Sequence, residues 1–132
     1  MRSTRKSRGQ ASRKAAFAVL QCKPRDPAAV KKLRQSLGLN RTKFARLMAA
    51  SERAVADWES GRPLSPVNQK SLREAERLCG ALATIMEAEH VGEWLDTPND
   101  VFSGLKPLDL IERGEGDRLW RMIFEVESVA LG

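Results

Sequence analysis

The sequence has few of the residues from which enzyme and metal sites are built. It contains one histidine, two cysteines and no tyrosine. Cys22 and Cys79 are too few and too isolated to form a disulfide framework or a zinc site. His90 has no cysteine or second histidine nearby, and the chain has no phosphate-cradling glycine loop. We therefore expect no catalytic residue, no metal and no cofactor.

Long apolar runs are also missing. No stretch approaches the roughly 20 apolar residues that a transmembrane helix requires. The run from Ala15 to Leu20 follows basic residues, as in a signal peptide, but it is shorter than the roughly 7–15 residues expected of one. We expect a cytoplasmic protein that has no membrane partner.

Acidic residues are absent from the start of the chain. Residues 1–14 carry six basic residues and no acid, and residues 28–62 carry eight basic residues against three acids. Residues 63–132 reverse this balance, with seven basic and thirteen acidic residues. Such asymmetry indicates a polyanion partner for the first half and a different partner for the second. Residues 1–27 are predicted to be a basic extension, disordered without a partner.

No segment alternates convincingly as a strand would, and apolar residues instead recur at helical spacing. The fold is therefore predicted to be all-α. We expect four parts, namely the basic extension, a helix-turn-helix over 28–65, a connecting or dimerisation helix over 66–88, and a small helical domain over 89–132. The predicted helices cover residues 28–37, 41–48, 51–61, 66–87, 88–95, 107–113 and 117–131.

The second and third predicted helices have clear start signals. Asn40 is a good N-cap, and Leu39 and Phe44 flank it as a hydrophobic staple. Ser51 caps the next helix after a short turn, and Val55 and Trp58 define its buried face. Two amphipathic helices joined by a short turn are typical of a helix-turn-helix, whose second helix enters the DNA major groove. A helical hairpin with a charged outer face is the alternative interpretation.

If Val55 and Trp58 point inward, the outer face of the third helix carries candidate base-reading residues. Arg53 can make the bidentate contact with guanine, and Ala56 can touch a thymine methyl group. Asp57 can accept from cytosine or orient Arg53. Basic and amide side chains at the start of the second helix can hold a phosphate. The predicted DNA-binding residues are Asn40, Arg41, Lys43, Ser51, Glu52, Arg53, Ala56, Asp57 and Arg62.

Residues 30–63 resemble the Xre (phage-repressor-like) helix-turn-helix family. The shared elements are Leu37-Gly38-Leu39, Phe44-Ala45, Ser51, Val55 and Trp58-Glu59-Ser60-Gly61. The family often has glycine where this chain has Ala49, and if this position needs a positive φ the alanine costs about 1 kcal/mol. The family also often has Gln, Thr or Ser where this chain has Glu52, Ala54 and Ala56. The resemblance implies binding to operator DNA, with paired half-sites read by a homodimer.

Residues 90–132 resemble the C-terminal domain of Xre/MbcA/ParS antitoxins. The resemblance is carried by Trp94-Leu95-Asp96-Thr97-Pro98-Asn99, Gly104-x-x-Pro107-Leu108-Asp109-Leu110-Ile111 and Gly114-Glu115-Gly116. Val101-Phe102-Ser103 and the aromatic-rich final helix depart from the family pattern. The resemblance implies a partner that is a RES-domain toxin consuming NAD, whose active site the C-terminal region blocks. It places Trp120, Phe124, Val129, Leu131 and Gly132 at that contact.

The final helix carries more apolar surface than one narrow face. Leu119, Ile123, Val126 and Ala130 form one predicted stripe, while Trp120, Phe124 and Leu131 lie on another side. Either the small domain wraps this helix or a partner covers part of it. The leading hypothesis is an antitoxin that also represses its own operator. The alternative is a stand-alone regulator whose C-terminal half only dimerises.

Overall fold

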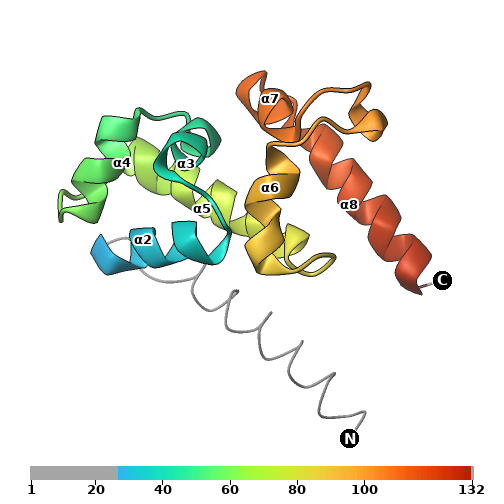
Figure 1. Cartoon of the computed structure of the whole chain (residues 1–132), viewed down its shortest axis with the longest axis horizontal. Coiled ribbons are helices and arrows are strands. Elements are labelled where there is room, and N and C mark those ends of the chain that lie inside the picture. The colour runs from blue at the N-terminus through green and yellow to red at the C-terminus, as the bar shows by residue number, and fades with distance from the viewer. Residues whose placement is uncertain (1–26, 132) are drawn as a thin grey trace, which may run out of the picture.

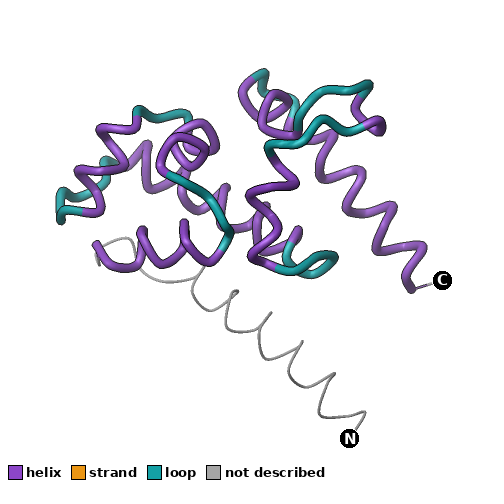
Figure 2. The backbone as a smooth tube through the Cα atoms, in the orientation of Figure 1, coloured by secondary structure: helices purple, strands orange, loops and turns teal. Residues whose placement is uncertain are grey.

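A computed structural model of the chain describes residues 27–131. This part of the chain is helical throughout and contains no strand, and Asn99 and Leu105 form an isolated bridge between two loops. Figure 2 shows the helices in purple, joined by short loops in teal. The prediction of an all-α fold is confirmed. The predicted basic extension lies outside the described residues, apart from Pro27.

Three helices make up the first half, namely α2 (Pro27–Ser36), α3 (Arg41–Met48) and α4 (Glu52–Glu59). Both predicted N-caps are confirmed. The Asn40 Oδ1 accepts a hydrogen bond from the Lys43 N–H at 2.8 Å, and the Ser51 Oγ accepts one from the Ala54 N–H at 3.0 Å. The bonds satisfy backbone donors that a helix start otherwise leaves unpaired. The inward positions Phe44 and Val55 are fully buried.

The connection between α3 and α4 contains one strained residue. Ala49 lies in the left-handed region with a φ of 54°, and its N–H donates to Arg46 O at 3.2 Å. The Ala50 N–H donates to Ala45 O at 2.9 Å and completes the helix ending. The positive φ expected at Ala49 is thus present. An alanine in this conformation costs about 1–2 kcal/mol, because its Cβ approaches the following carbonyl oxygen.

The long helix α5 (Pro66–Leu82) begins at the predicted Ser65 cap but ends earlier than predicted. The prediction that it reaches Glu87 is wrong. After Leu82 the Thr84 N–H donates to Ala81 O at 3.1 Å, and the Ile85 N–H donates to Leu82 O at 3.0 Å. These bonds span three residues instead of four and tighten the chain into turns. The Thr84 hydroxyl also donates to Ala81 O, which competes with continuation of the helix.

The second half contains η1 (Ala88–His90), α6 (Val91–Leu95), η2 (Asp100–Phe102), α7 (Pro107–Glu112) and α8 (Gly116–Leu131). In Figure 1, α6, α7 and α8 lie on the side of the molecule away from α4, and α8 runs out to the C-terminus. The prediction that Asp117 caps the last helix is wrong. The helix already begins at Gly116, so Asp117 lies in its first turn, where its negative charge still suits the helix dipole.

The two halves share one hydrophobic core. The same buried cluster includes Phe44 and Trp58 from the first half, Leu82 from α5, and Leu108 and Leu119 from the second half. Cys79 is buried in this cluster, and its burial raises the pKa of the thiol to about 12. The core therefore crosses the boundaries predicted at residues 65 and 88.

The halves also meet backbone against backbone. The Gly92 N–H at the start of α6 donates to Leu37 O at 2.7 Å. A Cβ added at residue 92 would lie 2.5 Å from Gly38 O and 2.7 Å from Leu37 O, which is closer than van der Waals contact allows. Only glycine fits at this approach. The contact holds the turn between α2 and α3 directly against α6.

Within residues 27–131, no helix is long and apolar enough to cross a membrane. The same residues contain no group of three or more His, Cys, Asp or Glu side chains placed to hold a metal ion.

Candidate partner-binding surfaces

The first candidate surface is the outer face of α3 and α4, where eight of the nine predicted DNA-binding residues gather; the ninth, Arg62, follows α4. Trp58 and Val55 are buried beneath it, as predicted. Arg53 and Glu52 project from exposed positions in the first turn of α4, and Ala56 and Asp57 are half-buried one turn later. The structure thus brings Arg53 and Ala56 onto one side of α4, as the periodicity predicts.

The acidic residues of this surface are paired with neighbours. The Glu52 carboxylate accepts a hydrogen bond from the Thr42 hydroxyl, which links the start of α4 to α3. Asp57 forms an ion pair with Arg62 at 3.2 Å. The structure therefore pairs Asp57 with Arg62, and not with Arg53 as one interpretation expected. Both pairings reduce the free negative charge beside Arg53.

Glu59, in the Trp58-Glu59-Ser60-Gly61 ending, holds the helices of the first half together. Its side chain is only 3% exposed and receives the Arg34 guanidinium at 2.9 and 3.1 Å and the Arg41 guanidinium at 3.3 Å. Burial alone would raise the pKa of Glu59, but the hydrogen bonds from Arg34 and Arg41 hold it below its ordinary value. Arg41 is thus anchored at one side while half of its side chain remains exposed. The Arg34 pairing spans 25 residues, so local spacing could not reveal it.

A cluster of charged side chains joins the first surface to the second half of the chain. The Arg46 guanidinium on α3 lies 3.0 Å from Asp109 and also contacts Glu112, both on α7. Asp96 is 3.3 Å from the ammonium groups of both Lys43 and Lys106. We call Lys43, Arg46, Asp96, Lys106, Asp109 and Glu112 the junction cluster.

The junction cluster changes the charge state that its members prefer. Burial alone would raise the pKa of Asp96, but the hydrogen bonds from Lys43 and Lys106 lower it. The Glu112 hydrogen bond raises the pKa of Arg46 and keeps the guanidinium charged. Lys43, a predicted phosphate contact, therefore has a carboxylate partner within its own chain. Sequence reasoning did not find this cluster, because its members lie up to 66 residues apart.

The second candidate surface is α8. Leu119 and Ile123 are buried, as the predicted stripe requires, but Val126 in the same stripe is 40% exposed. Phe124 is 68% exposed and Val129 is 80% exposed. The helix is therefore packed in its first half and exposes large apolar side chains in its second half. The side chain of Leu131 and all of Gly132, two predicted toxin contacts, lie outside the described residues.

Trp120, another predicted toxin contact, is half-buried against the body of the molecule. The Arg77 guanidinium of α5 lies over its ring, 6.0 Å from the centroid. Trp120 also lines a hollow of about 250 Å³ in which Leu47, Ala49, Leu78 and Ile111 take part. Core packing therefore accounts for much of the Trp120 side chain, in contrast to Phe124 one turn later.

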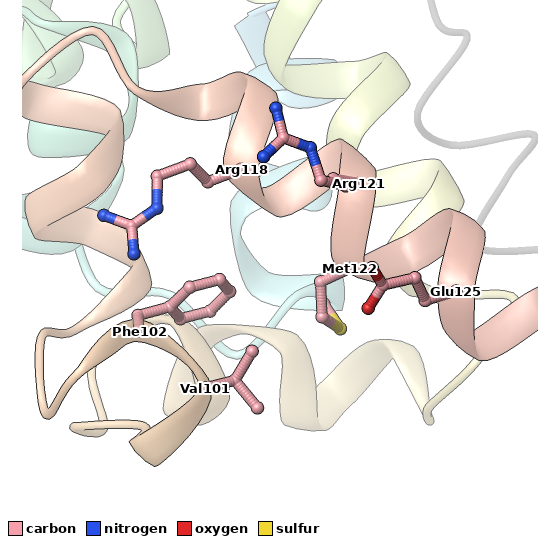
Figure 3. A pocket seen from close by; sticks show the side chains of 6 residues that line it. All are labelled: Val101, Phe102, Arg118, Arg121, Met122 and Glu125. Atoms are coloured by element: carbon pink, nitrogen blue, oxygen red, sulfur yellow. The ribbon is translucent and has the colours of Figure 1, made fainter.

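A second hollow opens between η2 and α8 on another side of the helix. Figure 3 shows Val101 and Phe102 of η2 facing Met122 of α8, with Arg118 and Arg121 beside them. Phe102 is buried and contacts Trp94 edge to face, with 6.4 Å between ring centroids. Val101 is 64% exposed at the rim. Val101 and Phe102 belong to the segment that departs from the antitoxin family pattern.

Comparison with known proteins identifies relatives, although no family model matches the chain. The mycobacterial cidal antitoxin MbcA of Mycobacterium tuberculosis is 30% identical over 90 residues, which cover 67% of this chain and 80% of that protein. The MbcA protein of Mycobacterium bovis matches to the same extent. A probable mycobacterial cidal antitoxin of M. tuberculosis is 28% identical over 76 residues, 58% of this chain and 65% of that protein.

The fold has a solved counterpart. A chain in the crystal structure of the M. tuberculosis MbcT-MbcA toxin-antitoxin complex superposes with a TM-score of 0.59 at 28% identity, covering 74% of this chain and 88% of that chain. The sequence relationship and the structural match agree. The chain belongs to the MbcA family of antitoxins.

Proposed function

We propose that this chain is the antitoxin of a toxin-antitoxin pair, and that it has two activities. Its helix α8 binds and neutralises a RES-domain toxin that consumes NAD. Its α3–α4 pair acts as an Xre-type helix-turn-helix, and a homodimer of the chain binds its own operator and represses transcription. The observation that carries the proposal is the exposed apolar second half of α8 in a chain related to an antitoxin solved with its toxin.

The toxin-binding part is supported by the surface chemistry of α8. Phe124, Val126 and Val129 are the large apolar side chains that α8 exposes among the described residues. Monomeric proteins rarely leave such side chains together in water, and a partner surface accounts for them. Phe124 and Val129 are five residues apart, which places them about 140° apart around the helix. A toxin that contacts both therefore surrounds the last turns of α8 instead of covering one side.

The DNA-binding part is supported by the charge of the α3–α4 surface. Arg53 projects from the first turn of α4, where a recognition helix presents its base-reading residues. Glu52 and Asp57, which would repel phosphates, are paired with Thr42 and Arg62. Arg41 and Arg62 remain accessible at the edges of the surface and suit phosphate contacts.

The toxin part is tested by purifying the chain with the RES-domain protein encoded beside it and measuring NAD consumption. We expect a stable complex in which NAD consumption is suppressed. A Phe124→Ser/Val129→Ser variant should weaken the complex by about tenfold or more, because it removes two exposed apolar anchors. Val67→Ser is the matched control, since Val67 is equally exposed but lies on α5. Neutralisation that survives the double substitution, or the lack of any RES-domain neighbour, favours the stand-alone regulator.

The DNA part is tested by binding to the DNA upstream of the gene, measured at several salt concentrations. Arg53→Ala should weaken specific binding by about 1–3 kcal/mol, while binding to unrelated DNA changes little. Arg113→Ala removes an exposed arginine from the end of α7 and serves as the control. Equal loss on operator and unrelated DNA would mean that Arg53 contacts only phosphates.

A further inference from the structure

We propose that the hollow between η2 and α8 is a docking pocket for the toxin, and that it receives an apolar side chain lying next to a carboxylate. The proposal rests on the proposed antitoxin function and adds a site that the toxin-contact prediction does not contain. The predicted contacts Phe124, Val129, Leu131 and Gly132 belong to the last two turns of α8. The pocket lies nearer the start of the helix.

The shape of the hollow suits one apolar side chain. Its volume is about 240 Å³. A cavity of about 150 Å³ already accepts a benzene-sized molecule, so a branched or aromatic side chain fits. The floor is formed by Phe102 and Met122, and exposed Val101 forms the rim (Figure 3). Methionine adapts its shape to an incoming side chain, because its thioether is flexible and polarisable.

The charge of the hollow selects a carboxylate beside that apolar group. Arg118 and Arg121 are the two basic residues of α8, and both line the pocket. Arg121 is 71% exposed, and its nearest carboxylate is Asp117 at 3.8 Å, so its guanidinium retains donors for another anion. Arg118 lies 3.4 Å from Glu115 and 5.9 Å from the Phe102 ring, which fixes its position at the wall. A guanidinium held in this way suits bidentate contact with a carboxylate.

The pocket is continuous with the exposed end of α8. Met122, Val126 and Val129 are spaced four and then three residues apart, which places them on one face of the helix. Together with Val101 they form an apolar strip that runs from the pocket toward the C-terminus. A toxin already seated on Val129 therefore has a continuous path to the pocket.

A second copy of the chain fits this face less well than a toxin segment does. A twofold dimer applies the same patch to both partners. Such a dimer across the strip would bring Arg118 and Arg121 of one copy toward the same arginines of the other. Like charges at an interface oppose binding, whereas a carboxylate on a different protein satisfies them.

The test measures the affinity of the purified RES-domain neighbour for Val101→Asp and Arg121→Glu variants of the full chain. Each substitution is at an exposed side chain, and each should weaken toxin binding about tenfold or more through lost apolar contact or charge repulsion. Val67→Asp and Arg113→Glu are the matched controls and should leave the affinity unchanged. Circular dichroism melting curves check that every variant is folded.

The outcomes separate this proposal from the proposed function. If the wild-type chain binds the toxin and both pocket variants bind equally well, the pocket proposal is overturned and the antitoxin function stands. If the wild-type chain does not bind the RES-domain protein at all, both fail. If Val101→Asp instead lowers the mass of a self-assembled species and leaves toxin binding intact, the pocket serves contact between copies and the proposal is wrong.

Discussion

The two candidate surfaces differ in how far the chain itself satisfies them. On the α3–α4 surface the acidic side chains Glu52, Asp57 and Glu59 all have partners within the chain. On α8 the large apolar side chains Phe124 and Val129 are mostly exposed. A polar surface of this kind is stable in water and gains a partner through long-range charge attraction. An apolar surface gains stability only when a partner removes it from water.

The surfaces also differ in what holds them, and yet they form one body. The α3–α4 surface is fixed by the helix caps and by Glu59, whereas the first half of α8 is fixed by core packing of Leu119 and Ile123. The junction cluster and the Gly92 approach connect the two regions. A partner on α8 therefore acts on a chain whose α3–α4 pair cannot move independently without breaking these contacts.

The largest effect is expected where the two regions touch through their backbones. Gly92→Ala inserts a Cβ that would lie 2.5 Å from Gly38 O, so the α2–α3 turn and α6 must separate. We expect a loss of about 3 kcal/mol in the free energy of unfolding, measured by urea denaturation. Gly116→Ala is the control, because a Cβ there has open space and should be neutral. Equal stability of the two variants would show that the regions are not tightly joined.

A smaller effect is expected from the charged part of the junction. Arg46→Ala leaves Asp109 and Glu112 without their shared guanidinium. We expect a loss of about 1 kcal/mol, less at high salt, since these groups are partly exposed and screened. Denaturant titrations at low and high salt measure it, with Arg113→Ala as the exposed arginine control. An unchanged free energy of unfolding at low salt would mean that the Gly92 contact alone joins the two regions.

A substitution confined to the α3–α4 surface should be stabilising. Ala49→Gly removes the Cβ penalty at a φ of 54° but adds flexibility to the unfolded chain. The net gain expected is about 0.5 kcal/mol, seen as a higher midpoint in thermal unfolding. Ala81→Gly, in the interior of α5, should lower stability instead, by about 1 kcal/mol. If both variants are destabilised alike, the left-handed conformation of Ala49 carries no strain.

The smallest effect is expected on α5, which lies between the two surfaces. Burial raises the pKa of Glu76 to about 7, against the opposing influence of Arg73. A carboxyl group with a raised folded pKa contributes stability below its unfolded pKa of about 4.3, and this is lost as the pH rises to about 7. Glu76→Gln should flatten this decline and be slightly more stable than wild type at pH 8. Parallel pH profiles for both proteins would show that Glu76 titrates normally.

Much of the local structure was predictable because its causes lie within a few residues. The caps at Asn40, Ser51 and Ser65, the buried Val55 and Trp58, and the positive φ at Ala49 all follow from short-range patterns. The end of α5 was missed because three-residue hydrogen bonds and the Thr84 hydroxyl replace the helical pattern there. Apolar periodicity continues across that point and predicted a longer helix.

The relation between the two halves was not predictable from local patterns. Arg46 with Glu112, Arg34 with Glu59 and Gly92 with Leu37 join residues far apart in the sequence. The apolar residues of α8 also could not be divided by periodicity alone. Leu119 and Val126 belong to one stripe, but the body of the molecule reaches only the first of them. Which apolar residues remain for a partner depends on where the core ends.

The central claim is that one rigid chain offers separate surfaces to DNA and to a toxin. The most direct test is to measure the mass of assemblies formed when the chain, its upstream DNA and the purified RES-domain neighbour are mixed in turn. The account predicts a ternary assembly, in which Phe124→Ser/Val129→Ser removes only the toxin and Arg53→Ala weakens only the DNA. Displacement of the DNA by the toxin at any ratio, or loss of both partners through either variant, would contradict it.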